Sequence, residues 1–272
     1  MMRALIILSA LSLWASLGPA AAQHCWYKET WPPKCVDENP RYNDGMLKAG
    51  WHVRFSEPTN RYGHAVLGDT PEWGELQVIW MGSRWHGVNH FYSMTLPENR
   101  VFEDLTPRVH YFGEKWGHQY VVTESDASKG ARVSIYATNH DTQGFDLVAA
   151  TPFIGTRNRW LAIVGIGDLN GDGHTEIAYI DRPHLAKTLR VFSFQEGTLK
   201  EIASAKGFTN HKIGEDFITS GLRECDGKNP EMIMVDAKWN KVMAVSLEGS
   251  KLTSHEVGPF KSRKSVEAAL RC

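Results

Sequence analysis

Oxygen-bearing side chains alternate along one short segment of the chain, 168–176, whose residues are Asp-Leu-Asn-Gly-Asp-Gly-His-Thr-Glu. A tightly turning loop with this spacing points its oxygens at one hard cation, and calcium prefers six to eight oxygen ligands. The two glycines permit the sharp turn and any positive φ that it requires. We expect a single calcium ion here, bound by the side chains of Asp168, Asn170, Asp172 and Glu176 and by the backbone carbonyl of His174.

An EF-hand begins with a similar run of oxygens, but it needs a bidentate glutamate at its twelfth position and a helix on each side. The twelfth position here is Tyr179, and the flanking segments 163–166 and 177–180 are rich in β-branched residues, which favour strands. A plain turn is the other alternative, and it accounts for the glycines but not for four spaced oxygen ligands. The sequence therefore predicts a calcium loop between two strands.

Strand-like segments separated by polar turns recur along the chain in units of about 50 residues, the length of one propeller blade. Each unit begins with a pair of strands whose connecting loop corresponds to the calcium loop. We expect these pairs at 62–69 with 75–80, 109–112 with 119–123, 160–168 with 176–181, and 217–222 with 231–236. A second pair follows at 132–137 with 145–148, 189–194 with 199–203, and 242–247 with 252–257. The sequence predicts an all-β protein, a small β-propeller of four to five four-stranded blades.

The segment 163–194 resembles the repeat of the FG-GAP/VCBS families, the integrin-alpha-like propellers, whose blades carry Asp-x-Asn/Asp-x-Asp-Gly-x-x-Asp between two strands. The chain as a whole looks like an exported bacterial protein with VCBS repeats, and the resemblance implies a β-propeller that binds calcium. Glu176 stands where these families have their last aspartate. The corresponding loops of the other repeats lack alternating carboxylates, so we expect one ion in the chain and not one per blade.

The N-terminus has the three parts of a secretory signal peptide, namely a positive start at 1–3, an apolar run at 5–17 and small residues at 20–22. The apolar run is shorter than the ~20 residues of a membrane span, and no comparable stretch follows. We expect a signal peptide at 1–22 and a secreted or periplasmic protein without a membrane span. Further along, we expect an N-terminal segment at 23–60, propeller repeats at 61–260 and a tail at 261–272, with a short helix at 265–270. A strand at 51–55 is expected to close the ring against the C-terminal part of the chain.

Four cysteines follow the signal peptide, an even number in an exported protein, so two disulfides are their expected use. Four cysteines allow three pairings, and proximity favours Cys25 with Cys35 and Cys225 with Cys272. The second bond would fasten the seam where the ends of the ring meet. Zinc binding is the alternative, but the cysteine and histidine spacings typical of zinc sites do not occur in the sequence.

An aromatic-rich segment at 80–92 is the best candidate for ligand recognition, because its loop offers flat apolar surface beside hydrogen-bonding groups. Such a surface suits sugar rings or a peptide. The residues expected to contact the ligand are Arg84, Trp85, His86 and Asn89. Three other aromatic residues of the segment are expected to pack between blades: Trp80, Phe91 and Tyr92. The histidines at 86, 90, 110 and 118 match no spacing of metal ligands, and scattered surface or inter-blade positions are expected for them.

Charge and motifs restrict the function further. A formal net charge of −1 with scattered lysines and arginines argues against a nucleic-acid partner, which requires a basic face. Motifs for a nucleophile elbow, a phosphate loop, a dinucleotide fold or a zinc protease do not occur in the sequence. We expect a monomeric, calcium-binding module that binds a protein or glycan or acts as a scaffold. The alternative is a hydrolase or lyase in the central funnel of the propeller, and paired carboxylates or a His/Asp cluster at the centre would favour it.

Overall fold

Antiparallel β-strands make up nearly all of the regular structure, which confirms the all-β fold class. The computed structural model describes residues 45–47, 51–68, 71–81 and 89–272. All of these belong to one compact unit, Pro40–Cys272. In this part of the chain the structure has one helix, α1 (Arg263–Ala269), close to the helix expected at 265–270.

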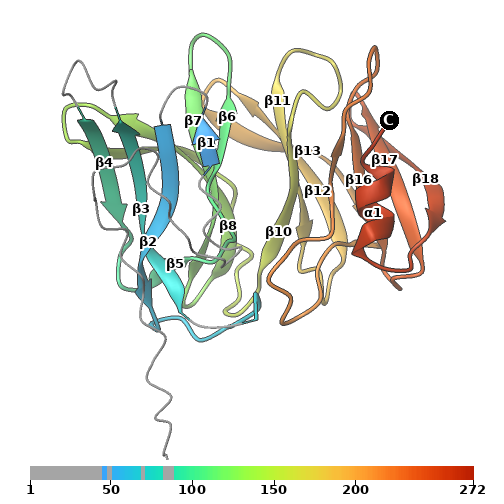
Figure 1. Ribbon diagram of the computed structural model, residues 1–272, viewed down its shortest axis with the longest axis horizontal. Coiled ribbons are helices and arrows are strands. Elements are labelled where there is room, and N and C mark those ends of the chain that lie inside the picture. Colours follow the sequence, from blue (N-terminus) through green and yellow to red (C-terminus); the bar gives the residue numbers. More distant parts are fainter. Residues whose placement is uncertain (1–44, 48–50, 69–70, 82–88) are drawn as a thin grey trace, which may run out of the picture. The chain divides into compact units, whose positions relative to one another are not determined.

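The described strands follow one another in four antiparallel meanders (Figure 1). The first meander contains β1 (Gly45–Leu47), β2 (Trp51–Thr59), β3 (Glu72–Met81) and β4 (Asn89–Thr95). The second contains β6 (Arg108–Tyr111), β7 (His118–Asp126), β8 (Gly130–Asn139) and β9 (Gly144–Ala150). The third contains β10 (Leu161–Gly167), β11 (Thr175–Asp181), β12 (Thr188–Gln195) and β13 (Thr198–Lys206). The fourth contains β15 (Gly221–Arg223), β16 (Glu231–Asp236), β17 (Lys241–Glu248) and β18 (Lys251–Pro259).

Two short strands extend these meanders. Strand β5 (Arg100–Phe102) pairs with β3 and β7, and it thereby joins the first and second meanders into one nine-stranded sheet. Strand β14 (Phe208–Thr209) pairs with β16, so that the fourth meander belongs to a five-stranded sheet. The third meander is a separate four-stranded sheet, β10-β11-β12-β13, and this is the strand organisation that the sequence predicts around the acidic loop.

Alternation along the strands explains how the sheets stack. In β11, Ile177 and Tyr179 enter the apolar cluster shared with the second meander, whereas Ala178 and Ile180 enter the cluster shared with the fourth. A strand buried on both faces carries apolar side chains on both, as β11 does from Ile177 to Ile180. The outermost strands β13 and β18 are mainly exposed and carry polar side chains. Three apolar clusters of this kind join the four meanders face to face in chain order, which is the packing of propeller blades.

The outer face of the fourth meander is covered by α1. Val266 and Ala269 of the helix pack on Ile233 and Val235 of β16 in a fourth apolar cluster (Figure 1). A disulfide joins Cys225 to Cys272 just beyond the helix, with 5.7 Å between the Cα atoms. The pairing predicted for these cysteines is confirmed, but the bond fastens the helix to its own sheet and not to a ring seam.

The strand expected to close a ring has other partners. Residues 51–55 lie in β2, which pairs with β3 over most of its length and with β1 on its other edge. The expectation that this strand pairs with the C-terminal part of the chain is therefore wrong. The physical reason is that β1 and β3 occupy both edges of β2, while its side chains Val53 and Phe55 join the apolar cluster between the first and second meanders.

The strand expected at 62–69 is also not formed in its described residues. Ala65 and Gly68 have positive φ, 52° and 99°, so the backbone turns instead of extending. The turned segment reaches the connection between the third and fourth meanders, where the Gly214 N–H donates to the Val66 carbonyl at 3.0 Å. A Cβ atom at Gly68 would lie 2.6 Å from the Gly214 carbonyl oxygen, so this close approach requires a glycine.

Candidate metal centre

The acidic loop 168–174 connects β10 to β11. At the base of the loop the two strands end their pairing with Gly167 opposite Glu176. Strands on both sides confirm that the loop is not an EF-hand. Gly171 and Gly173 have φ values of 79° and 86°, which a side chain would strain. A Cβ atom at Gly171 would also lie 2.8 Å from the amide oxygen of Asn229, so the loop packs against the β15–β16 loop of the fourth meander.

Backbone N–H groups orient two of the carboxylates in this loop. Asp168 accepts hydrogen bonds from the N–H groups of Gly171 at 2.7 Å and Gly173 at 2.9 Å. Asp172 accepts one from the His174 N–H at 2.8 Å, and this bond lowers the pKa of Asp172. Both carboxylates are therefore held in place by the backbone before any ion is considered.

The third carboxylate, Glu176, is fully buried. Its Oε2 accepts a hydrogen bond from the Leu169 N–H at 2.9 Å, and the Ser193 hydroxyl on the paired strand β12 also interacts with the carboxylate. Its Oε1 is buried without a hydrogen-bond partner of regular geometry among the described residues. Burial raises the pKa of Glu176. Carboxylate oxygens of Asp168, Asp172 and Glu176 all lie within 4.8 Å of one another, so three acidic groups converge at one point. A bound cation would compensate them.

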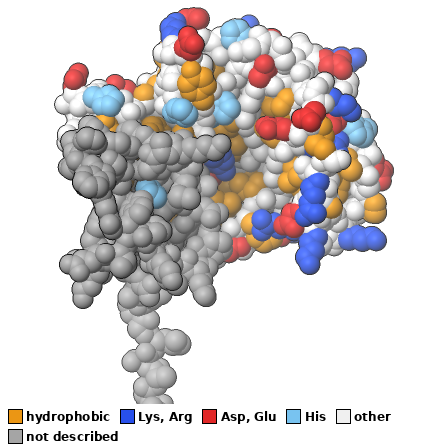
Figure 2. Space-filling view, turned by 45° about the horizontal axis from the view of Figure 1, so that its top comes forward, with side chains coloured by type: hydrophobic (Ala, Val, Ile, Leu, Met, Phe, Trp, Pro, Cys, Tyr) orange, Lys and Arg blue, Asp and Glu red, His pale blue; other side chains and the backbone are white. Residues whose placement is uncertain are grey.

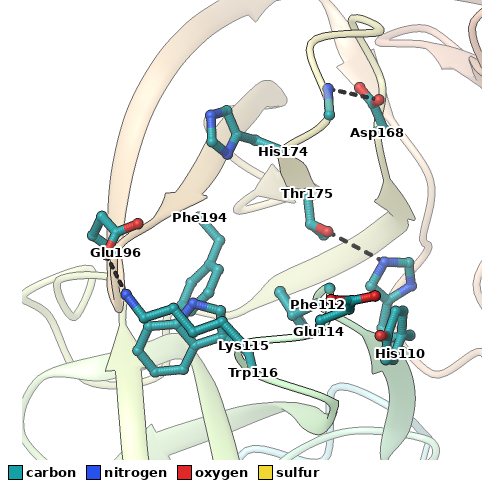
Figure 3. A pocket seen from close by; sticks show the side chains of 13 residues that line it. His110, Phe112, Glu114, Lys115, Trp116, Asp168, His174, Thr175, Phe194 and Glu196 are labelled. Atoms are coloured by element: carbon teal, nitrogen blue, oxygen red, sulfur yellow. Dashed lines mark hydrogen bonds and ion pairs between the residues drawn. The ribbon is translucent and has the colours of Figure 1, made fainter.

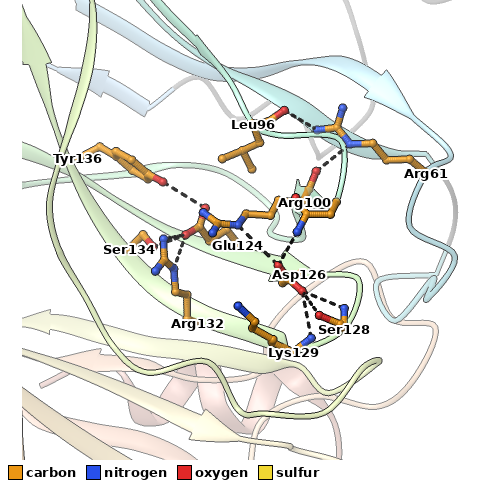
Figure 4. A network of polar contacts seen from close by, with 11 residues as sticks. Arg61, Leu96, Arg100, Glu124, Asp126, Ser128, Lys129, Arg132, Ser134 and Tyr136 are labelled. Atoms are coloured by element: carbon orange, nitrogen blue, oxygen red, sulfur yellow. Dashed lines mark hydrogen bonds and ion pairs between the residues drawn. The ribbon is translucent and has the colours of Figure 1, made fainter.

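Glu124 is another fully buried glutamate, and both of its carboxylate oxygens have protein partners (Figure 4). It lies in the second meander and forms an ion pair with Arg132. Its Oε1 also accepts from Ser134 at 2.8 Å, and its Oε2 accepts from the Tyr136 hydroxyl at 3.1 Å. Both oxygens of this buried carboxylate thus have protein partners, whereas Glu176 Oε1 has none of regular geometry among the described residues.

The fourth meander offers a closer comparison. Glu231 occupies the position of Glu176 in the pairing scheme, because each pairs with the last residue of the preceding strand, Arg223 and Gly167 respectively. The Arg223 guanidinium lies 2.6 Å from Glu231 Oε2. Burial alone would raise the pKa of Glu231, but Arg223 holds it below its ordinary value. Gly167 has no side chain that could do the same for Glu176.

The structure brings three of the five predicted metal ligands together by their carboxylates: Asp168, Asp172 and Glu176. Asn170 lies in the same loop, where its Oδ1 accepts from the Asp172 N–H at 3.0 Å. Its Nδ2 reaches the Gly249 carbonyl of the fourth meander at 3.3 Å. Coordination by Asn170 and by the His174 carbonyl stays a prediction.

The predicted ligand-binding loop falls largely outside the described residues. Arg84, Trp85 and His86 lie there, as do Cys25 and Cys35 with their predicted disulfide. Asn89 is the first residue of β4, and its side chain is not described. Two of the neighbouring aromatic residues are described. Tyr92 is buried between the first and second meanders as expected, but Phe91 is 46% exposed, so its predicted packing between blades is wrong.

A second group of titratable side chains lies beside Trp160, and the sequence did not reveal it. His184 Nε2 lies 3.0 Å from His211 Nδ1, and His211 Nε2 lies 2.8 Å from a backbone carbonyl. The ring of Trp160 is 4.9 Å from that of His211. Burial lowers the pKa of both histidines, that of His184 to about 4, so both are neutral at pH 7. Their partners come from segments more than 20 residues apart, which is why local spacing gave no signal.

Comparison with known proteins adds little to this description. No family model matches the chain, and no curated protein matches it either. Among solved structures, the crystal structure of Saccharomyces cerevisiae Sqt1 is similar, with 10% sequence identity and a TM-score of 0.36. The match covers 67% of this chain and 43% of that one. A TM-score this low carries no functional information. The strands and loops of the described residues define an all-β protein of stacked meanders with an acidic loop site.

Proposed function

We propose that the protein is an exported, calcium-stabilised binding module built from propeller-type sheets. The observation that carries this proposal is the buried Glu176 carboxylate, which converges with Asp168 and Asp172 and keeps one oxygen without a partner among the described residues. An ion at this position would offset the cost of the buried charge. It would also rigidify the β10–β11 loop, which touches the fourth meander through Asn170.

The chemistry of the ligands favours calcium over other divalent ions. Carboxylate, amide and carbonyl oxygens are hard ligands, whereas zinc and copper sites in proteins use histidine or cysteine. Magnesium demands a near-octahedral shell at short distance and keeps several waters, whereas calcium accepts irregular loops with more ligands. The resemblance of 163–194 to FG-GAP/VCBS repeats supports the same assignment.

Export to an oxidising compartment has two supports. The disulfide between Cys225 and Cys272 is of the kind that persists outside the cytosol. The N-terminal sequence has the three parts of a signal peptide. Among the described residues, no helix is long and apolar enough to cross a membrane.

A binding role is favoured over a hydrolase or lyase by the state of His184 and His211. Both ring nitrogens of His211 are within hydrogen-bonding distance of protein atoms, and the pKa of His184 is too low for a general base at neutral pH. His64 and Ser125 likewise contact the fully buried Glu103. These contacts are those of structural groups that stabilise the meeting point of several segments.

Calorimetric titration of the EDTA-treated protein with calcium chloride tests the proposal. We expect one ion per chain and a Kd of about 0.1–1 mM or tighter, the range of extracellular calcium modules. Asp172→Asn should lose most of the binding heat, and magnesium should bind more weakly. Asp141→Asn, an exposed aspartate in the β8–β9 turn, is the matched control and should bind like wild type. Absence of binding heat and of any rise in melting temperature at about 10 mM calcium would refute the proposal.

A further inference from the structure

A pocket with a volume of about 400 Å³ lies between the second and third meanders (Figure 3). Three segments line it: the β6–β7 loop with the end of β6, the β10–β11 loop with Thr175, and the end of β12 with Glu196. Thr175 faces the pocket, and the next residue, Glu176, points to the opposite side of β11 because side chains alternate along a strand. The acidic loop therefore forms a wall of the pocket and leaves the Glu176 carboxylate outside it.

The floor of the pocket is aromatic and well supported. The ring of Phe194 lies 4.9 Å from that of Phe112 and 5.3 Å from that of Trp116, in edge-to-face arrangement. Two backbone hydrogen bonds of 2.8 Å close the β6–β7 loop that carries Trp116, one from Phe112 N–H to the Gly117 carbonyl and one from Gly117 N–H to the Gly113 carbonyl. A floor held in this way is largely formed before a ligand arrives.

Polar groups surround this floor. His110 Nε2 lies 3.4 Å from the Thr175 hydroxyl, and burial, with a smaller effect of His118, lowers the pKa of His110. The ammonium of Lys115 pairs with Glu196, and it also lies 5.2 Å from the centre of the Trp116 ring. Figure 2 shows the face that carries these loops, on which histidine, acidic and basic side chains lie close together.

The charges of the pocket select against ionic ligands. The pocket lining carries three carboxylates and one ammonium, that of Lys115, so an anion would be repelled. The carboxylates are those of Glu114, Asp168 and Glu196. A cation would have to displace Lys115 from Glu196, and Asp168 is assigned to the proposed calcium site. Hydrogen-bond donors and acceptors beside aromatic rings suit a neutral ligand that has hydroxyl groups and an apolar face.

We propose that this pocket binds a neutral saccharide of one or two sugar units, with the ring against Trp116 and the hydroxyl groups toward His110, Thr175 and Glu196. The part that the calcium ion plays in sugar binding rests on the proposed function. Asp168 and Gly173 belong both to the acidic loop and to the pocket wall, so calcium would stabilise the wall and tighten sugar binding.

Saturation-transfer NMR and calorimetry with a defined probe set test the proposal: glucose, galactose, mannose and N-acetylglucosamine, and the disaccharides maltose, cellobiose, lactose and chitobiose. We expect at least one probe to bind the calcium-loaded protein with a Kd of about 1 mM or tighter. Trp116→Ala should weaken binding at least about tenfold, which is 1.4 kcal/mol. Thr175→Val is a nearly isosteric second variant that removes one hydroxyl. It should also weaken binding of the same probe, and it provides the test if Trp116→Ala does not fold. Phe91→Ala, an exposed aromatic residue outside the pocket lining, should bind like wild type.

Three results would overturn the inference. One is the absence of binding for all eight probes at about 20 mM. Another is equal binding by wild type and both pocket variants. The third is preferential binding of lysine or arginine methyl ester, which would make the pocket a cation site. If EDTA lowers the melting temperature but no sugar binds, the calcium proposal stands and the saccharide proposal falls. If EDTA changes neither sugar binding nor the melting temperature, the saccharide proposal stands and the calcium proposal falls.

Discussion

The substitution Glu176→Gln separates two effects on the free energy of unfolding: the cost of burying the carboxylate charge and the gain from binding the ion. Burial raises the pKa of Glu176 above its ordinary value of 4.5, so the stability that this group contributes is complete below pH 4.5 and is lost as the pH rises through the folded pKa. At pH 8 in EDTA, the Glu176→Gln variant should therefore be more stable than wild type. An unsatisfied buried group costs about 1–3 kcal/mol, equivalent to about 2–12 °C in melting temperature for a chain of this size.

Calcium should reverse this order. At a free concentration of about one hundred times Kd, wild type should gain about 2.7 kcal/mol, or about 5–11 °C. The Glu176→Gln variant keeps the Asp168 and Asp172 carboxylates but lacks the third charge, so its gain should be much smaller. The variant is then expected to melt above wild type in EDTA and below it in calcium.

Differential scanning calorimetry in EDTA and in calcium, at pH 8 and pH 4, measures both effects. At pH 4 the difference in EDTA should shrink, because wild-type Glu176 is then protonated. Glu231→Gln is the control: it breaks the ion pair with Arg223, so it should lose stability with and without calcium. The reasoning is refuted if Glu176→Gln melts below wild type in EDTA at pH 8, or if both proteins gain equally from calcium.

Three further predictions concern the stacked sheets. Burial and the nearby His211 lower the pKa of His184 from 6.5 to about 4, so its contribution to stability is present above pH 6.5 and is lost as the pH falls toward 4. His184→Gln should reduce the pH dependence of the unfolding free energy in that window by at most about 3 kcal/mol, measured by urea unfolding. Reduction of the Cys225–Cys272 bond, which spans 47 residues, should cost up to about 4 kcal/mol, and faster amide exchange in α1 should accompany it. Gly165→Ala should cost about 1–3 kcal/mol, because its Cβ would lie 2.3 Å from Leu222 Cγ, and a second change, Leu222→Ala, should recover part of the loss. Full stability of the single Gly165 variant in urea would contradict that packing.

Local patterns in the sequence determine the strands and the acidic loop. Alternation of apolar and polar residues acts over a few positions, and so does turn chemistry, so 176–181 and 231–236 are recognisable as strands and appear as β11 and β16. The same holds for the spacing of Asp168, Asp172 and Glu176, since one turning loop is enough to bring the three carboxylates together. The Cys225–Cys272 pair was predicted from proximity and is present in the structure.

Only the tertiary structure decided which groups meet across long sequence separations. Glu176 has an oxygen without a partner of regular geometry among the described residues, and Gly167 stands where the fourth meander has Arg223, a comparison that requires the strand register. The pocket beside Trp116 is lined by three segments on two sheets. The outer face of the fourth meander is covered by α1 and not by another sheet. Such contacts are selected by the packing of whole sheets, because the free energy of burying a face depends on what covers it and not on the residues next to it in the chain.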